Sequence, residues 1–260
     1  MDNYEGNKSG SSDIVMLKKR SKQTYSSALK IDLDALQRQG FQVVRQYGVD
    51  EYKLERELSL LSGGKLFFSK RMGGICHRFK VLPSSQNFSE QMRCGGYHTD
   101  FMFQPSPPAF IALLCLIPDP KHPFYGRNQI VHIDDFINKM KAVYGVDREA
   151  LAEMDIAFEL PNKTIVKQPI LAHLNGKMIV KFHELMMSDR QPNETLSISL
   201  KDAFHAVFSD VAYDICLDQG DLLIISNHHA FHRRSECSIT FNSEVGDFMS
   251  REMATIRFDL

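Results

Sequence analysis

The chain has 260 residues, of which 43% are hydrophobic and 24% are charged. This balance is typical of a globular protein, and the length suffices for one β-rich domain with a substantial core. The formal net charge is −1, from 31 basic and 32 acidic residues, so there is no basic excess to indicate nucleic acid as the main partner.

The distribution of apolar residues and the cysteine pattern do not indicate a membrane or secreted protein. The longest apolar run, residues 109–117, is too short to span a bilayer, and residues 1–12 lack the apolar core of a secretory signal. The five cysteines are odd in number and have no CxxC spacing, which favours reduced thiols over disulfides or a zinc site. We therefore expect a cytoplasmic protein without a membrane partner, and the sequence does not indicate its oligomeric state.

Residues 1–27 are rich in Ser, Lys, Gly and Asn, which predicts a flexible polar tail. We expect residues 28–260 to form one domain. A short strand is predicted over residues 40–44, followed by a helix over residues 50–61. Asp50 is the expected N-cap of that helix, and the glycine pair at 63–64 ends it.

From residue 95 onward, short apolar segments predict strands separated by few helices. The predicted strands cover residues 97–103, 110–116, 128–132, 165–170, 177–182, 222–226 and 253–258. Helices are predicted over residues 134–144 and 201–211. This pattern indicates a mostly β fold with flanking helices, closer to a double-sheet jelly roll than to a doubly wound parallel sheet.

The first chemical signal is the segment Gly95-Gly-Tyr-His-Thr-Asp-Phe101. Because side chains alternate along a strand, His98 and Asp100 are expected to point to the same face, with Thr99 on the other. An imidazole and a carboxylate so placed can hold two adjacent corners of a metal site. Taken alone, such a tripeptide is also common on surface strands.

The second chemical signal is the segment 219–234, in which a turn and an apolar strand precede three histidines. A histidine at the end of a buried strand can supply a third metal ligand. Two histidines and one carboxylate with open positions form the facial triad of non-haem Fe(II) oxygenases. The residues alone leave His228, His229 and His232 as alternatives for the third ligand.

Together the two segments resemble the taurine dioxygenase / clavaminate synthase-like family of Fe(II)/2-oxoglutarate-dependent oxygenases. Gly96-Tyr-His-Thr-Asp-Phe, followed by Ser106-Pro-Pro-Ala109 and an apolar strand, is similar to the first family motif. Gly220-Asp-Leu-Leu-Ile-Ile-Ser-Asn227, with a histidine five residues further on, is similar to the second. Arg234 also matches the clavaminate synthase-like branch. The resemblance extends over about residues 40–258.

This resemblance implies a distorted double-stranded β-helix, or jelly roll, that binds one Fe(II). It implies that His98, Asp100 and His232 are the iron ligands and the catalytic centre. His232 is preferred because its distance from Asn227 matches the family. On this interpretation His228 and His229 are mouth or surface residues.

The co-substrate implied by the resemblance, 2-oxoglutarate, needs a cation for its distal carboxylate, and the arginine fork suits a carboxylate. The family places this arginine on the strand after the last histidine. Arg251 and Arg257 are both candidates, and six residues apart they share a face of a regular strand. We expect Arg251 to bind the co-substrate. Arg257 would then contact substrate or pair with an acidic residue.

The sequence departs from the family at the turn that usually precedes a small hydroxyl residue. That turn reads Gly126-Arg-Asn-Gln129, and we expect the Gln129 amide to donate the corresponding hydrogen bond to 2-oxoglutarate. Residues expected near the mouth, where substrate would bind, are Phe101, Phe103, Gln104 and Arg234. The alternative for each is ordinary packing or surface pairing.

The activity implied by the resemblance is oxidation, by default hydroxylation, of a small molecule such as an amino acid or a metabolite built from one. O2 and 2-oxoglutarate would be consumed, and succinate and CO2 released. Two alternatives come from other classes. A non-catalytic jelly-roll binding protein would have lost the triad, and a non-haem iron oxidase or cupin-like enzyme would not use 2-oxoglutarate.

Overall fold

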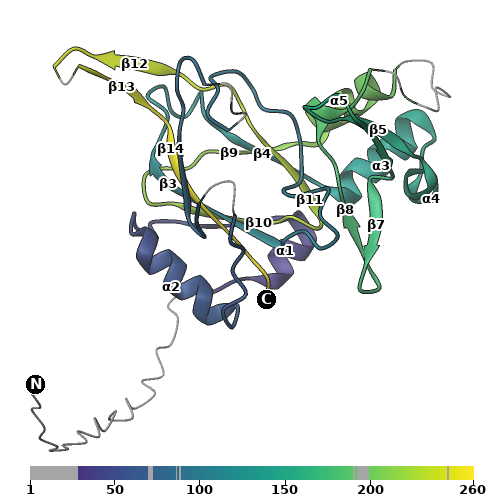
Figure 1. Ribbon diagram of the computed structural model, residues 1–260, viewed down its shortest axis with the longest axis horizontal. Coiled ribbons are helices and arrows are strands. Elements are labelled where there is room, and N and C mark those ends of the chain that lie inside the picture. Colours follow the sequence, from purple (N-terminus) through teal and green to yellow (C-terminus); the bar gives the residue numbers. More distant parts are fainter. Residues whose placement is uncertain are drawn as a thin grey trace, which may run out of the picture.

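The computed structural model describes residues 29–69, 73–85, 87, 89–189, 191, 199–244 and 246–260, so the predicted tail lies outside the described residues. Strands dominate the fold, which is mostly β (Figure 1). The strands are β1 (Phe41–Val44), β2 (His77–Lys80), β3 (Phe110–Ile117), β4 (Asn128–His132), β5 (Ile156–Glu159), β6 (Ile165–Gln168), β7 (Leu171–Leu174), β8 (Lys177–Val180), β9 (Tyr213–Ile215), β10 (Leu222–Ser226), β11 (Ala230–Arg234), β12 (Ile239–Asn242), β13 (Asp247–Ser250) and β14 (Glu252–Phe258). The helices are α1 (Leu33–Gln39), α2 (Glu51–Leu61), α3 (Ile133–Tyr144), α4 (Arg148–Glu153), the short 3-10 helix η1 (Glu184–Met186) and α5 (Leu200–Val211).

Two antiparallel sheets form the body of the protein. The larger has the strand order β1-β10-β3-β14-β2, and the smaller has the order β11-β4-β9. A buried apolar cluster lies between them and takes residues from both sheets, among them Ile111, Ile130, Leu223 and Met253. Burial of this shared face holds the two sheets together.

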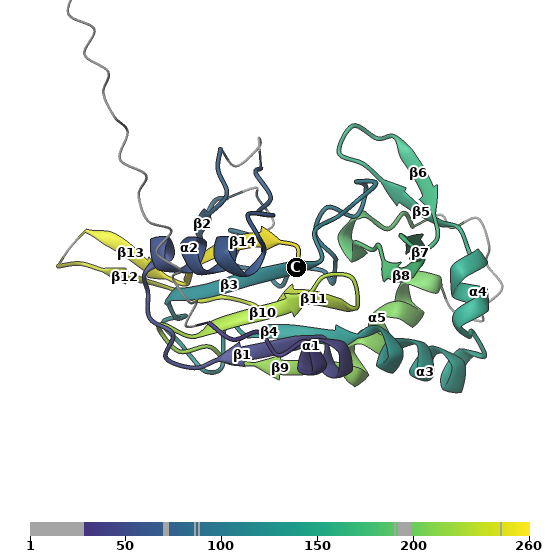
Figure 2. The same cartoon turned by 90° about the horizontal axis from the view of Figure 1, so that it is seen from below.

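Helices cover the remaining faces. Leu54 and Leu58 of α2 pack with Leu222 and Ile224 of β10, on the side of the large sheet away from the small one. Because both faces of β10 are covered, its sequence is a continuous apolar run without alternation. At the other end of the sheets, α3, α4 and α5 gather with the hairpins β5–β6 and β7–β8, opposite the projecting hairpin β12–β13 (Figure 2).

Several predicted elements are confirmed. β4 and β10 have the predicted bounds, and the predicted helices correspond to α2, α3 and α5 with shifts of one residue. The Asp50 carboxylate accepts the backbone N–H of Lys53 at 2.9 Å, as an N-cap does. Within the described residues, no helix is long and apolar enough to cross a membrane.

The predicted strand over residues 97–103 is wrong beyond His98. Strand pairing is confined to two isolated bridges at His98, with His183 and with His232, and the chain then turns over residues 100–103. Phe101 has a φ of 58°, in the left-handed region that a strand excludes. The turn forms because the backbone of Asp100 hydrogen-bonds the side chain of Asn227 instead of a neighbouring strand.

The glycine that ends α1 touches the strand that carries His232. Gly40 has a φ of 82°, and a Cβ built there would lie 2.6 Å from the Cβ of Ala230 in β11. Gly145 ends α3 with a similar φ of 70°, but a Cβ there would meet nothing within 4 Å. The two positions share the backbone requirement and differ in the space around them.

We therefore expect Gly40→Ala to lower the free energy of unfolding by about 2–4 kcal/mol, through left-handed strain plus overpacking. Gly145→Ala should cost about 1–2 kcal/mol, from the strain alone. Urea denaturation of both variants measures the difference. Equal losses would show that the contact with β11 is not tight.

Candidate metal centre

Three side chains that could ligate a metal converge where the 97–100 segment meets β11. One ligand atom from each of His98, Asp100 and His232 lies within 4.8 Å of the others. The Oδ1 of Asp100 is 3.5 Å from Nε2 of His98 and 3.7 Å from Nε2 of His232. The structure thus brings together the three residues singled out in the sequence.

Backbone pairing places the two imidazoles side by side. The N–H of His98 donates to the carbonyl of His232, and the N–H of His232 donates to the carbonyl of His98, both at 3.0 Å. Residues opposed in this way on an antiparallel pair project to the same side. The ring centroids of the two histidines are accordingly 4.3 Å apart.

The hydrogen bond of His98 fixes which of its nitrogens can accept a metal. Nδ1 of His98 lies 2.9 Å from the carbonyl oxygen of Gly96. A carbonyl can only accept, so this Nδ1 carries the proton and Nε2 presents its lone pair toward Asp100. Metal-ligating histidines are commonly oriented by such a contact.

Asp100 is held at its backbone and at its carboxylate. Asn227, at the end of β10, accepts the N–H of Asp100 at 2.7 Å and donates to its carbonyl at 3.0 Å. Nε of Arg257 donates to Oδ2 of Asp100 at 2.5 Å. Burial alone would raise the pKa of Asp100, but the positive charge of Arg257 beside it holds that pKa well below its usual range.

A third histidine adjoins the cluster and was not singled out from the sequence. His183 forms a backbone bridge with His98, and their ring centroids are 5.1 Å apart. Burial, reinforced by the neighbouring His98, lowers the pKa of His183 to about 3, and the same two causes lower that of His232 to about 4. Both imidazoles are therefore neutral near pH 7, which a metal ligand requires.

The other two histidines considered for the third ligand lie outside the cluster. Nε2 of His228 is 3.0 Å from the carbonyl of Pro107, and Nδ1 of His229 is 3.0 Å from the hydroxyl of Ser226. His228 and His229 both lie in the loop between β10 and β11. Of the three histidines, only His232 shares a site with His98 and Asp100.

Arg251 contacts Asn128, which the sequence analysis did not select. Its Nη2 donates to Oδ1 of Asn128 at 2.8 Å, and both residues are buried. Gln129 occupies the opposite face of β4, where its amide donates to Asp214 at 2.7 Å and accepts from Arg233 at 2.7 Å. Strand alternation thus turns Gln129 away from Arg251, and the structure gives no contact between them.

Phe101, Phe103 and Gln104, which were expected near the mouth, differ from one another in their contacts. The guanidinium of Arg257 lies 5.2 Å from the ring centroid of Phe101. Phe103 is partly exposed and packs edge-on against Phe158, and the carbonyl of Gln104 accepts from Lys181.

Arg234, the other residue expected near the mouth, is engaged by several groups of the protein. Its guanidinium donates to the carbonyls of Gln91, Arg93 and Ser235 and to the sulfur of Cys237. These bonds tie the 91–93 segment to the end of β11.

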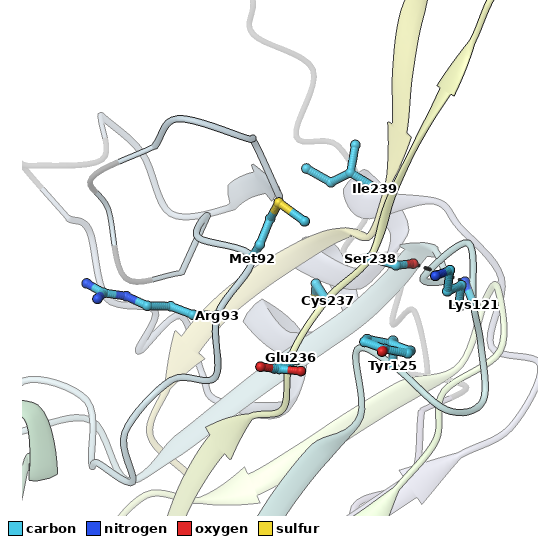
Figure 3. A pocket seen from close by; sticks show the side chains of 8 residues that line it. All are labelled: Met92, Arg93, Lys121, Tyr125, Glu236, Cys237, Ser238 and Ile239. Carbon is cyan, nitrogen blue, oxygen red and sulfur yellow. Dashed lines mark hydrogen bonds between the residues drawn. The ribbon is translucent and has the colours of Figure 1, made fainter.

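A cavity of about 430 Å³ lies beyond the end of β11, away from the three ligating side chains. Its walls include Arg93, Lys121 and Glu236, with Cys237 at its side (Figure 3). None of His98, Asp100 or His232 lines it, so it is separate from the metal centre.

The low pKa values of His183 and His232 predict a pH-dependent stability of the metal-free protein. In the unfolded chain both histidines protonate near pH 6.5, whereas in the fold they stay neutral down to about pH 4 and about 3. As the pH falls from about 7.5 to about 5, the unfolded state therefore binds more protons and stability declines, by about 1–2 kcal/mol per buried histidine.

Urea denaturation in the presence of a chelator, at about pH 7.5 and about pH 5, measures this decline. His183→Gln should reduce it, whereas His173→Gln, at an exposed position of β7, should leave it as in the wild type. An equal decline in all three proteins would contradict the assignment.

No protein-family model matches the chain, and no curated protein matches it. Several solved structures, however, match its fold. An asparagine oxygenase in complex with Fe(II), 3-hydroxyasparagine and succinate matches with a TM-score of 0.62 and 16% identity, over 88% of this chain and 77% of that one. The non-haem iron oxygenase OrfP, in complex with Fe and α-ketoglutaric acid, matches with a TM-score of 0.59 and 17% identity, over 87% and 76%.

A further complex of OrfP, with Fe, succinate and a dihydroxy-arginine, gives a TM-score of 0.62 at 16% identity, over 87% and 78% of the two chains. At this level of identity the comparisons concern the fold. They confirm the fold-level resemblance inferred from the two motifs. The chain therefore has the fold of the non-haem Fe(II)/2-oxoglutarate oxygenases.

Proposed function

We propose that this protein is an Fe(II)- and 2-oxoglutarate-dependent dioxygenase that hydroxylates an amino acid or a small molecule derived from one. The observation that carries the proposal is the convergence of His98, Asp100 and His232 within a fold shared with such oxygenases. The proposal includes a jelly-roll arrangement of the two sheets, a single domain over residues 28–260 and a cytoplasmic location.

The donor set fits a ferrous ion. Two neutral imidazoles and one ionised carboxylate oxygen are the ligands of the facial triad, and they leave positions open for co-substrate and oxygen. The tautomer of His98 and the lowered pKa of His232 make both nitrogens available. With 2-oxoglutarate and O2, iron bound there would supply the oxidising chemistry, while the protein supplies orientation and exclusion of water.

Arg251 and Asn128 fit the distal carboxylate of the co-substrate. Arg251 is buried, burial lowers the pKa of its guanidinium, and its hydrogen bond goes to a neutral amide. Nδ2 of Asn128 and Oγ1 of Thr255 are buried without a hydrogen-bond partner among the described residues. A carboxylate bound here would pair the cation and accept from the amide, removing two costs of burial.

The substrate class follows from the matched oxygenases, whose complexes contain hydroxylated asparagine or arginine. Phe101, Phe103 and Gln104 lie on the turn that leaves Asp100, so they are the expected substrate contacts. Arg234 is the weaker candidate, because backbone carbonyls engage its guanidinium.

The iron site predicts a matched pair of histidine variants. Anaerobic titration should show one Fe(II) bound per chain in the wild type. His232→Ala should abolish tight binding, whereas His229→Ala, three residues away and bonded to Ser226, should retain it. Retention by His232→Ala together with loss in His229→Ala would transfer the third ligand to His229.

The co-substrate site predicts a large effect of Arg251. Arg251→Ala should weaken 2-oxoglutarate binding to the anaerobic Fe(II)-protein by about thirty-fold to several thousand-fold, because a desolvated charge pair loses one partner. Arg251→Lys should recover part of the affinity, since an ammonium lacks the two-pronged geometry. Isothermal titration measures both.

The neighbouring amides provide the control for that experiment. Asn128→Ala should weaken 2-oxoglutarate binding, and Gln129→Ala, on the opposite face of β4, should leave it near the wild-type value. The reverse order would restore the expectation based on the family turn. If the wild type bound Fe(II) but no 2-oxoglutarate, the protein would be an oxidase or cupin-like enzyme.

A further inference from the structure

The two carboxylate oxygens of Asp100 have different surroundings. Oδ1 faces Nε2 of His98 at 3.5 Å and Nε2 of His232 at 3.7 Å. Oδ2 accepts a hydrogen bond from Nε of Arg257 at 2.5 Å. The oxygen directed toward the two imidazoles is therefore Oδ1, while Oδ2 is engaged by a buried cation.

We propose that Arg257 is a positioning residue that makes Asp100 a one-oxygen ligand of the metal. The inference rests on the proposed iron site and assigns Arg257 a different role from Arg251. The contact partner of Arg257 is a carboxylate of the metal centre, whereas that of Arg251 is the neutral amide of Asn128.

Each partner of this ion pair has further contacts that hold it in place. Arg257 lies on β14 opposite Ile111 of β3, and its guanidinium is 5.2 Å from the ring centroid of Phe101. Phe101 follows Asp100 in the turn and has a left-handed φ. Asn227 fixes the backbone of Asp100 at both its N–H and its carbonyl. The pairing geometry is thus set by three separate segments.

The arrangement has two consequences for metal binding. A carboxylate with two free oxygens can chelate a metal through both, which would occupy an additional coordination position. With Oδ2 bound to Arg257, chelation requires breaking a charge-assisted hydrogen bond in a buried site. Arg257 also balances the Asp100 charge in the metal-free protein, so the buried carboxylate is not left uncompensated.

The test is metal affinity and coordination, measured without turnover. Arg257→Gln and Arg257→Lys are titrated anaerobically with Fe(II) and with Co(II), whose visible absorption reports its ligand geometry. Loss of an outer contact to a metal ligand typically costs 10- to 100-fold in metal affinity, and we expect about that loss in Arg257→Gln, with an altered Co(II) spectrum. Arg257→Lys should bind more tightly than Arg257→Gln and less tightly than the wild type.

Arg251→Gln is the matched control, because it removes the other buried arginine of this part of the chain, at the residue that precedes β14. It should leave the Co(II) spectrum and metal affinity near the wild type and weaken only 2-oxoglutarate binding. If the folded Arg257 variants bound metal as the wild type does, with an unchanged Co(II) spectrum, the inference would be overturned whatever happened to 2-oxoglutarate.

Two further outcomes are decisive. If Arg257→Gln does not fold by circular dichroism, Arg257→Lys alone decides, and wild-type metal affinity in that variant would sink the inference. Failure of the wild type to bind Fe(II) or Co(II) would instead overturn the proposed function, and the inference with it. The wild-type titration therefore separates the two failures.

Discussion

The reciprocal hydrogen bonds between the backbones of His98 and His232 are the interaction on which the candidate site depends. They join the segment that precedes β3 to β11, two parts of the chain that are far apart in sequence. This pairing brings His232 close to Asp100, which lies two residues from His98 in the sequence. Because β11 is also paired with β4, the small sheet fixes the position of His232.

A cluster of buried aromatic rings packs beside the paired segments. Phe182 and Phe231 are fully buried with ring centroids 5.6 Å apart, and Phe208 lies 5.0 Å from Phe231. Phe231 immediately precedes His232, and the carbonyl of Phe182 accepts the N–H of Thr99 beside His98. Large rings in edge-on contact leave little room for either segment to shift, so the packing that stabilises the fold also keeps His98 and His232 in register.

The two buried arginines of the site have different partners. Asp100 and Arg257 neutralise each other beside the imidazoles, and Arg251, just before β14, lies against Asn128. A buried cation beside a neutral amide is a costly arrangement, and an anionic ligand would relieve the cost. Within β14, Met253, Thr255 and Arg257 share one face because side chains alternate along a strand, whereas Arg251 precedes the strand and a register shift lies between Glu252 and Met253.

Local signals in the sequence determined the elements whose formation needs few distant contacts. The Asp50 cap, the apolar faces of α2, α3 and α5 and the apolar run of β10 all predict what the structure contains. The spacing of His98 and Asp100, taken together with the second motif, also predicted that these two side chains share a site with His232. In each case the information lies within a few neighbouring residues, where propensity and periodicity act.

Tertiary structure decided what depends on register and on contacts between distant segments. Asn227 draws the backbone of Asp100 into a turn, so the strand predicted over residues 97–103 ends at His98. The pairing of β4 with β11 turns Asn128, not Gln129, toward Arg251. A one-residue change in register reverses every side chain of a strand, and only the partner strand fixes that register. For the same reason, the contact of Arg257 with Asp100 could not be read from the spacing of Arg251 and Arg257.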